Sequence, residues 1–242
     1  MRSIAVGIFC KTPTAGRSKT RLSPPLRPDE CATLSACFIR DLAETLRTLT
    51  LDGDVAGYAV YTPAGTEQAL RSLLPAHFGL LLQCEGDLGA RLLCATIDLL
   101  SLGHAGAILL NADSPTLPAA ILRAAVDAVR HQDAVVLSPA IDGGYTLIGL
   151  SKAHRHVFAN IPWSTPAVHR LTMERARETG VPVVNVPGWY DVDDSETLQL
   201  LEQELAGVPL PFAAPGLRGA DAAATRQFLA RRNAPRRVGS TR

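Results

Sequence analysis

The chain has 242 residues, of which 47% are hydrophobic and 19% are charged, and its formal net charge is +1. This length and apolar content suit one globular domain with a short appendage. The near-neutral charge excludes a strongly basic nucleic-acid-binding domain, because such domains carry a large excess of Lys and Arg. We find no apolar run that could cross a bilayer and no secretory signal pattern, so we expect a cytoplasmic protein.

Apolar runs alternate with amphipathic segments along the first 210 residues. The apolar run 4–9 ends in a basic loop, and leucines recur at helical spacing from Pro28 to the high forties. This alternation predicts a mostly parallel sheet covered by helices on both faces, a three-layer α/β/α fold, because parallel strands need crossover connections. Further strands are predicted at 55–62, 78–84, 105–110, 134–137, 146–150 and 181–186, and further helices at 66–74, 88–99, 118–130, 167–178 and about 196–205.

The composition changes after Pro209, where Ala, Pro and Arg become frequent. Phe228 and Leu229 predict a last short helix, and the segment from about 233 has the composition of a basic, poorly ordered tail. We therefore expect a main domain over residues 1–210 and a C-terminal appendage over residues 211–242.

The loop after the first predicted strand carries Lys11, Arg17, Lys19 and Arg21 with no acidic residue nearby, and Gly16 shapes a turn within it. Such a cluster can be merely solvated, as most basic runs are. Its position favours phosphate binding, because ligands of parallel α/β sheets bind at the carboxyl ends of strands. Lys19 would act as a point charge, and the two arginines would offer bidentate contacts. The loop matches neither a Walker A motif nor G-x-G-x-x-G.

Carboxylates follow three later strands of the predicted sheet. Asp113 either caps the next helix or holds Mg²⁺ or Mn²⁺ against phosphates, and Asp87 is likewise either a cap or a ligand. Asp191, Asp193 and Asp194 exceed what one helix cap needs, although Asp193 also fits a capping-box pattern. Asp191 and Asp193 can share one face of an extended segment, which favours a role at the site.

A second group of residues, at the same edge of the predicted sheet, is suited to contact an acceptor substrate. Asp142, Gly143 and Gly144 form a strong turn signal. A turn alone does not explain Tyr145 or the position of these residues at the edge of the predicted sheet. Trp163 can stack on a substrate or pack in the core.

Five segments in this order resemble one bacterial family: residues 9–22, 86–91, 113–117, 142–145 and 191–193. The family is glycosyltransferase-A-like, was formerly of unknown function, and includes proteins named rSAM/selenodomain-associated or arsenosugar-biosynthesis transferases. The resemblance implies a Rossmann-like nucleotide-diphospho-sugar transferase (GT-A) fold, a divalent cation and a nucleotide substrate. It extends to 2-phospholactate and molybdenum-cofactor guanylyltransferases, in which a comparable basic loop handles the phosphates of a nucleoside triphosphate.

Three hypotheses for function follow. The leading one is a glycosyltransferase that uses a nucleotide-sugar donor, a small-molecule acceptor and Mg²⁺ or Mn²⁺, with Lys19, Asp113 and Asp193 in catalysis and Asp191 assisting at the metal. Phosphate binding would involve the basic loop and Asp87, and the acceptor would meet residues 142–145 and Trp163. The alternatives are a nucleotidyltransferase, which releases pyrophosphate from a nucleoside triphosphate, and a non-catalytic nucleotide-binding protein. The donor base, the acceptor and the oligomeric state stay open.

Overall fold

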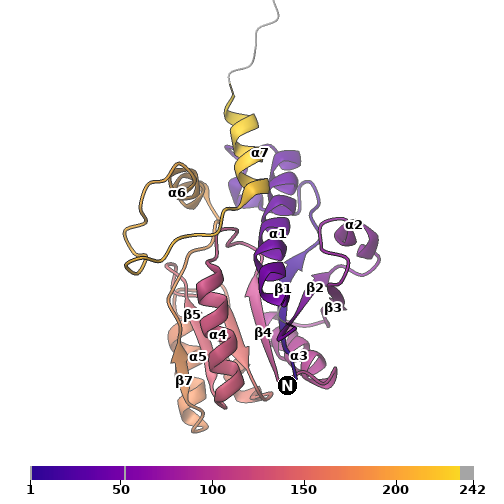
Figure 1. Cartoon of the computed structure of the whole chain (residues 1–242), viewed down its shortest axis with the longest axis vertical. Helices are drawn as coiled ribbons and strands as arrows, with labels where there is room; N and C mark the ends of the chain where they lie inside the picture. Colours follow the sequence, from indigo (N-terminus) through magenta and orange to yellow (C-terminus); the bar gives the residue numbers. More distant parts are fainter. Residues whose placement is uncertain (1, 52, 235–242) are drawn as a thin grey trace, which may run out of the picture.

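A computed structural model describes residues 2–51 and 53–234. Within them, seven strands form one sheet in the order β3-β2-β1-β4-β6-β5-β7, with helices on both faces (Figure 1). The strands are β1 Ile4–Lys11, β2 Val55–Thr62, β3 Gly79–Leu82, β4 Gly106–Asn111, β5 Val135–Pro139, β6 Tyr145–Leu150 and β7 Val183–Asn185. The helices are α1 Pro28–Thr50, α2 Glu67–Arg71, α3 Leu88–Ser101, α4 Ala119–His131, α5 Val168–Glu178, α6 Ser195–Leu205 and α7 Ala223–Asn233, with short 3₁₀ turns η1 Thr20–Leu22 and η2 Arg155–Phe158.

The mostly parallel sheet predicted from the sequence is confirmed. β1 lies between β2 and β4 and is parallel to both, β2 is parallel to β3, and β5 is parallel to β7. β6 is the exception, because it runs antiparallel to both β4 and β5. The connection between β5 and β6 is a tight turn, which can join only antiparallel neighbours. Because β1 and β4 are parallel neighbours, their carboxyl ends lie side by side.

Alternate residues of the central strand serve the two faces of the sheet. Ile4, Val6 and Ile8 are buried beneath α1 and α4, and Ala5 is buried on the face covered by α3 and α5. Gly7 also lies on the α3 face, where a Cβ atom would stand 2.8 Å from Val60 of β2 and 3.7 Å from Leu99 of α3. Helix α3 thus approaches the sheet closely, and its first turn comes near the end of β1.

The predicted helix around Phe228 and Leu229 is α7, which lies against α1 (Figure 1). The buried Asp41 of α1 accepts hydrogen bonds of 2.9 Å from the backbone N–H groups of Ala224 and Thr225. This carboxylate therefore caps the first turn of α7. The predicted basic tail lies outside the described residues from 235 onward.

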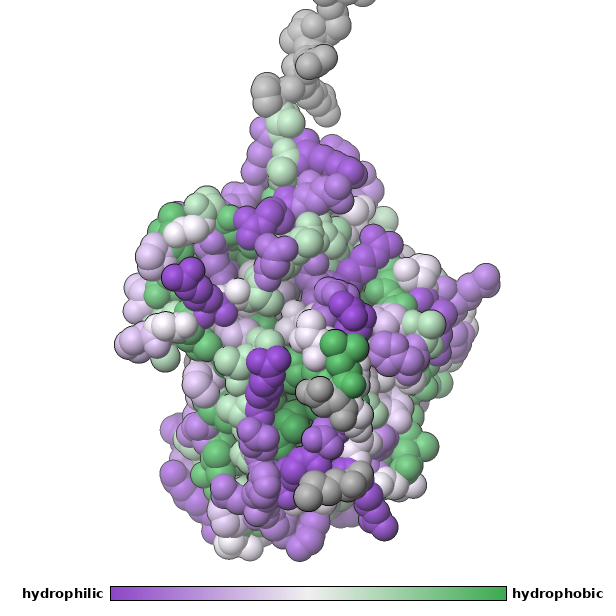
Figure 2. Space-filling model, viewed as in Figure 1, coloured by the Kyte–Doolittle hydropathy of each residue, from purple (hydrophilic) through white to green (hydrophobic). Residues whose placement is uncertain are grey.

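None of the helices in the described ranges is both long and apolar enough to traverse a membrane. Hydrophilic residues cover much of the face shown in Figure 2, with apolar residues interspersed among them.

Candidate functional site

A cleft of about 450 Å³ opens at the carboxyl ends of β1 and β4, next to the first turn of α3. Four cationic side chains line it, against two carboxylates, so its surface is positive. The cations are Lys11, Lys19, Arg21 and Arg91, and the carboxylates are Asp113 and Asp193; the other lining residues are Phe9, Cys10, Thr20, Gln83, Leu88 and Ala112.

The basic loop is folded by its own backbone. The carbonyl of Thr14 accepts hydrogen bonds from the backbone N–H groups of Arg17 and Ser18, and the hydroxyl of Ser18 accepts one from the N–H of Thr14. Gly16 has φ +75°, and Lys19 has φ +49°, a left-handed conformation that is costly for a residue with a side chain. Leu22 is fully buried and anchors the end of the loop. The strained backbone at Lys19 turns its side chain inward.

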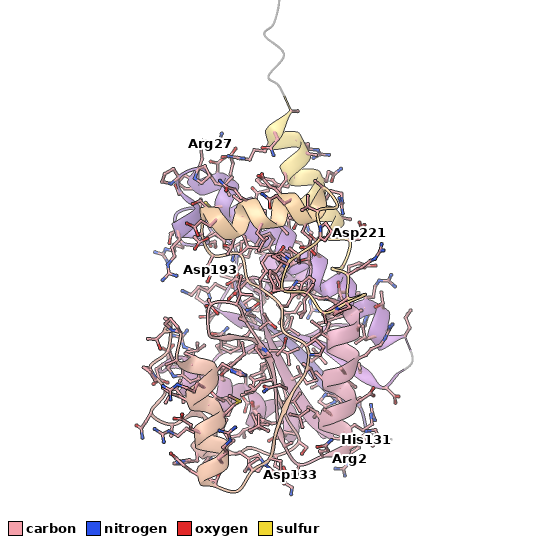
Figure 3. All side chains as sticks on the ribbon, turned by 90° about the vertical axis from the view of Figure 1, so that its left-hand side faces the viewer. Arg2, Arg27, His131, Asp133, Asp193 and Asp221 are labelled. Atoms are coloured by element: carbon pink, nitrogen blue, oxygen red, sulfur yellow. The ribbon has the colours of Figure 1, made fainter. Side chains whose placement is uncertain are left out.

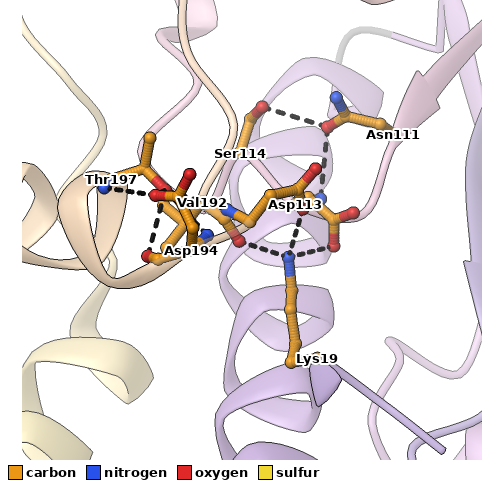
Figure 4. A network of polar contacts seen from close by, with 8 residues as sticks. Lys19, Asn111, Asp113, Ser114, Val192, Asp194 and Thr197 are labelled. Carbon is orange, nitrogen blue, oxygen red and sulfur yellow. Dashed lines mark hydrogen bonds and ion pairs between the residues drawn. The ribbon is translucent and has the colours of Figure 1, made fainter. Parts of the chain in front are cut away.

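The ammonium of Lys19 joins three segments that are far apart in the sequence (Figure 4). Its Nζ lies 2.5 Å from Oδ1 of Asp113, donates to the carbonyl oxygen of Val192 at 2.6 Å, and lies 3.4 Å from Oδ1 of Asp193. The Lys19 side chain is only 6% exposed, and its Nζ lies 5.1 Å from the centre of the Phe38 ring. The loop after β1, the segment after β4 and the segment before α6 are therefore connected by one cation.

Hydrogen bonds to its backbone groups fix the position of Asp113, and the residue does not cap a helix. Oδ1 of Asn111 accepts from the N–H of Asp113 and from the hydroxyl of Ser114, and the N–H of Val192 donates to the carbonyl of Asp113. Helix α4 begins later, with Pro118 at its N-cap, so the alternative that Asp113 caps this helix is wrong.

The three aspartates before α6 have different roles in the structure. Asp194 is the N-cap of α6 and accepts from the N–H of Thr197 at 2.9 Å, so the alternative that Asp193 is the cap is also wrong. Burial raises the pKa of Asp193, and the charge of Asp113 raises it further, while Lys19 opposes both effects. Burial raises the pKa of Asp191 to about 7, with added repulsion from Asp142, Asp193 and Asp113.

The two acidic segments and the turn after β5 therefore place four carboxylates near one another. Within residues 2–51 and 53–234, however, no three His, Cys, Asp or Glu side chains are close enough together to hold a metal ion by themselves. The predicted trio of Asp113, Asp191 and Asp193 is thus near the cleft without forming a complete cage.

Three residues predicted at the phosphates lie elsewhere. Asp87 accepts from the N–H of Ala90 at 2.8 Å and caps α3, which is the structural alternative weighed for it. Gly16 and Arg17 are exposed and do not line the cleft. Lys11, Lys19 and Arg21 are the members of the predicted phosphate group that do line it.

The predicted acceptor residues also separate into two groups. The Asp142 carboxylate accepts from the N–H of Gly144 at 2.8 Å and stabilises the turn between β5 and β6, in which Gly143 has φ +90°. The Tyr145 hydroxyl, in contrast, is enclosed in the core without a hydrogen-bond partner in the described structure, and burial raises its pKa. Trp163 packs against Gly89, where a Cβ atom would lie 2.9 Å from the indole. Tyr145 is therefore a packing residue, whereas Trp163 is half-buried beside Gly89, and the predicted acceptor contact of Trp163 and residues 142–144 stays a prediction.

Arg91 and Gln83 are among the residues of the cleft to which the sequence analysis assigns no role. Arg91 lies one turn into α3, and its Nε donates to the carbonyl of Gly86 at 2.9 Å, which fixes the guanidinium near the cleft. Gln83 follows β3 directly and is buried. The predicted strand 78–84 includes Gln83, whereas β3 ends at Leu82, so the sequence did not place Gln83 at a strand end, and an uncharged side chain did not stand out.

A family described as "Uncharacterized protein conserved in bacteria (DUF2064)" matches residues 45–165. Among solved structures, one described as a nucleotide-diphospho-sugar transferase from Desulfovibrio desulfuricans G20 is 27% identical, with a TM-score of 0.78 over 94% of this chain and 99% of that one. A cytidylyltransferase from Leptospira borgpetersenii is 13% identical, with a TM-score of 0.53 over 96% and 95%.

A 4-diphosphocytidyl-2C-methyl-D-erythritol synthase from Anaerococcus prevotii is 9% identical, with a TM-score of 0.55 over 85% and 96%. No curated protein matches the sequence. The fold predicted from the sequence, that of the nucleotide-diphospho-sugar transferases, is confirmed.

Proposed function

The chain belongs to the DUF2064 family, and on the basis of its cleft we propose that it is a transferase that acts on a nucleotide-activated substrate. The observation that carries the proposal is the Lys19 ammonium, held between Asp113 and Asp193 in a cleft that three further cations line. Fixed positive charge in a partly enclosed cleft favours an anion that carries several charges, such as the phosphate chain of a nucleotide. The cleft lies at the carboxyl ends of parallel strands, where α/β folds bind such ligands.

The reaction that we propose first is glycosyl transfer from a nucleotide sugar to a small-molecule acceptor. The likeness to the Desulfovibrio protein over nearly the whole of both chains supports this choice. Lys11, Arg21 and Arg91 would bind the diphosphate, and Lys19 would stabilise the negative charge that grows on it as the sugar leaves. The turn at residues 142–144 would bind the acceptor, so that rate enhancement comes mainly from positioning and from stabilising charge.

A divalent cation fits the donors near Lys19. Asp113 and Asp193 are partly exposed carboxylates, and hard oxygen donors of this kind suit Mg²⁺ or Mn²⁺. Mg²⁺ is usually held by one or two carboxylates together with substrate phosphates and water, so an incomplete protein cage is compatible with it. We propose that Asp113 and Asp193 hold the cation and that Asp191 assists. When bound, the cation would stabilise negative charge on the phosphates.

Calorimetry with nucleotide sugars and nucleoside diphosphates, with and without Mn²⁺, tests this proposal. We expect binding by the wild-type chain that Mn²⁺ strengthens for nucleoside diphosphates, and we expect Asp113→Asn to lose that Mn²⁺-dependent gain. Asp133→Asn is the matched control, because Asp133 lies at the bottom of the molecule in Figure 3, well away from Asp193. If no nucleotide of either kind binds, the proposal fails. Binding without release of UDP or GDP in any acceptor screen would instead indicate a nucleotide-binding protein without catalysis.

A second candidate is nucleotidyl transfer, in which a phosphorylated acceptor attacks the α-phosphorus of a nucleoside triphosphate and pyrophosphate leaves. The observation that favours it is that cations line the cleft from two sides, from the loop after β1 and from α3. A longer phosphate chain could contact both sides at once. A screen of the four nucleoside triphosphates against small phosphorylated acceptors tests it, because pyrophosphate release is specific to this reaction.

A further inference from the structure

The side chain of Gln83 is held in one orientation by backbone groups of two strands. Gln83 follows β3, and its Nε2 donates to the carbonyl oxygens of Cys10 in β1 at 3.1 Å and of Val60 in β2 at 2.9 Å. An amide nitrogen is a donor and an amide oxygen an acceptor, so two carbonyl partners determine which way the amide faces. With only 8% of the residue exposed, the amide has little freedom to turn.

The amide oxygen of Gln83 is therefore directed away from those two carbonyls. No described residue donates a hydrogen bond to Oε1, and this atom is not among the enclosed polar atoms that lack a partner. Gln83 lines the cleft, so solvent reaches Oε1 from that side. A fixed acceptor in a mostly buried position favours a ligand that donates to it.

The surroundings of this acceptor suit a flat ring. Leu88, the first residue of α3, keeps 38% of its surface exposed and lines the cleft, as does Phe9 of β1. Apolar side chains beside one oriented polar atom are typical of small-molecule sites, in which the apolar part supplies contact area and the polar atom supplies specificity. The cations of the same cleft would hold the charged part of the ligand.

We infer that Gln83 recognises the base of the nucleotide and selects a ring N–H donor, as in the N1–H of guanine or the N3–H of uracil. The inference rests on the proposed function, because it assumes that the cleft binds a nucleotide. Amides that select adenine generally use both the nitrogen and the oxygen. In this chain Nε2 is already occupied by two carbonyls, so Gln83 offers an acceptor alone, and a base with a ring N–H satisfies it.

Calorimetry on the wild-type chain tests the inference without any mutation. UDP is compared with 3-methyluridine diphosphate, and GDP with 1-methylguanosine diphosphate, because each methyl group replaces the ring hydrogen. We expect the methylated member of at least one pair to bind about tenfold more weakly, and ADP and CDP to bind more weakly than the better of UDP and GDP. The comparison also shows which of the two bases is used. Equal binding within both pairs, or tightest binding of ADP or CDP, would overturn the inference.

Gln83→Met gives an independent test, because methionine has a similar length and no acceptor of comparable strength. We expect this variant to lose the difference between the unmethylated and methylated nucleotide and to bind inorganic pyrophosphate as the wild type does. Gln132→Met, at the exposed end of α4, is the control for the substitution itself. If pyrophosphate and nucleotides all fail to bind the wild type, the proposed function falls together with the inference. If nucleotides bind without regard to the ring N–H, only the inference falls.

Discussion

Replacing Lys19 with methionine tests the centre of the site, because it keeps the length of the side chain and removes its charge. The variant leaves the Asp113 and Asp193 carboxylates and the Val192 carbonyl without their shared donor. Breaking a fully buried ion pair costs roughly 3–5 kcal/mol. The carboxylates here are 38% and 42% exposed, so water screens them, and we expect the free energy of unfolding to fall by only about 1–2 kcal/mol.

The effect of Lys19→Met on ligand binding should be larger than its effect on folding. A hydrogen bond between an ammonium and a phosphate contributes roughly 1.5–3 kcal/mol, so the affinity for a nucleoside diphosphate should fall about 10- to 100-fold. Calorimetry measures the affinity, and urea unfolding measures the stability. Lys152→Met is the matched control, because Lys152 is 70% exposed and pairs with Asp133 at 2.7 Å, far from the cleft (Figure 3).

Two results would refute this reasoning. If Lys19→Met is folded and binds the diphosphate within about twofold of the wild type, the ammonium does not contact the phosphates. If the Lys152→Met control loses as much affinity as Lys19→Met, the effect reflects net charge rather than the position of Lys19.

Substitutions at three further positions probe separate parts of the molecule. Arg91→Met should weaken pyrophosphate binding about tenfold and reduce its dependence on salt, as calorimetry at two ionic strengths would show. Asp41→Ala should lower the free energy of unfolding by about 2 kcal/mol, because two N–H groups of α7 lose their acceptor. The control is Glu44→Ala on the exposed side of α1, which should change the free energy of unfolding by less than about 0.5 kcal/mol. An unchanged urea midpoint in Asp41→Ala would contradict the capping role. Burial raises the pKa of Asp41 above its ordinary 3.8, in spite of the opposing hydrogen bonds. The free energy of unfolding of the wild type, measured relative to Asp41→Asn, should therefore be greatest below pH 3.8. It should decrease as the pH rises through the native pKa of Asp41. Gly143→Ala should raise the KM for the acceptor and leave donor affinity unchanged, because φ is +90° and a Cβ atom would lie 2.2 Å from the Pro166 carbonyl oxygen.

The fold was predictable because its signals are local. Each strand is a short apolar run and most helices carry a regular apolar stripe, so the alternation was visible without knowledge of tertiary contacts. The direction of β6 was not visible in the same way. Its antiparallel pairing follows from the tight turn after β5. The Asp-Gly-Gly sequence predicts a turn there, but the sequence does not show that the turn joins two antiparallel neighbours of the sheet.

The candidate site was predictable to the extent that it depends on strand ends. The rule that ligands bind at the carboxyl ends of parallel strands selected Lys19 and Asp113, and the surplus of carboxylates before α6 selected Asp193. The structure brings these three side chains together. The rule cannot say which way a side chain points. Tyr145 was expected at the acceptor, but it begins β6 and turns its hydroxyl into the core, whereas the buried Gln83 faces the cleft. Such directions depend on packing against α3 and α5.

The charge of the cleft links the number of phosphates in the substrate to the role of a metal ion. Four cations and two carboxylates line it, which leaves two positive charges. A nucleotide sugar carries roughly two negative charges and is balanced as it binds, whereas a nucleoside triphosphate carries roughly four. In glycosyl transfer a divalent cation would therefore matter most as charge grows on the leaving diphosphate, and would affect kcat more than donor affinity. In nucleotidyl transfer the same cation would be needed for the triphosphate to bind at all. The dependence of binding on Mn²⁺ thus separates the two reactions before any acceptor is known.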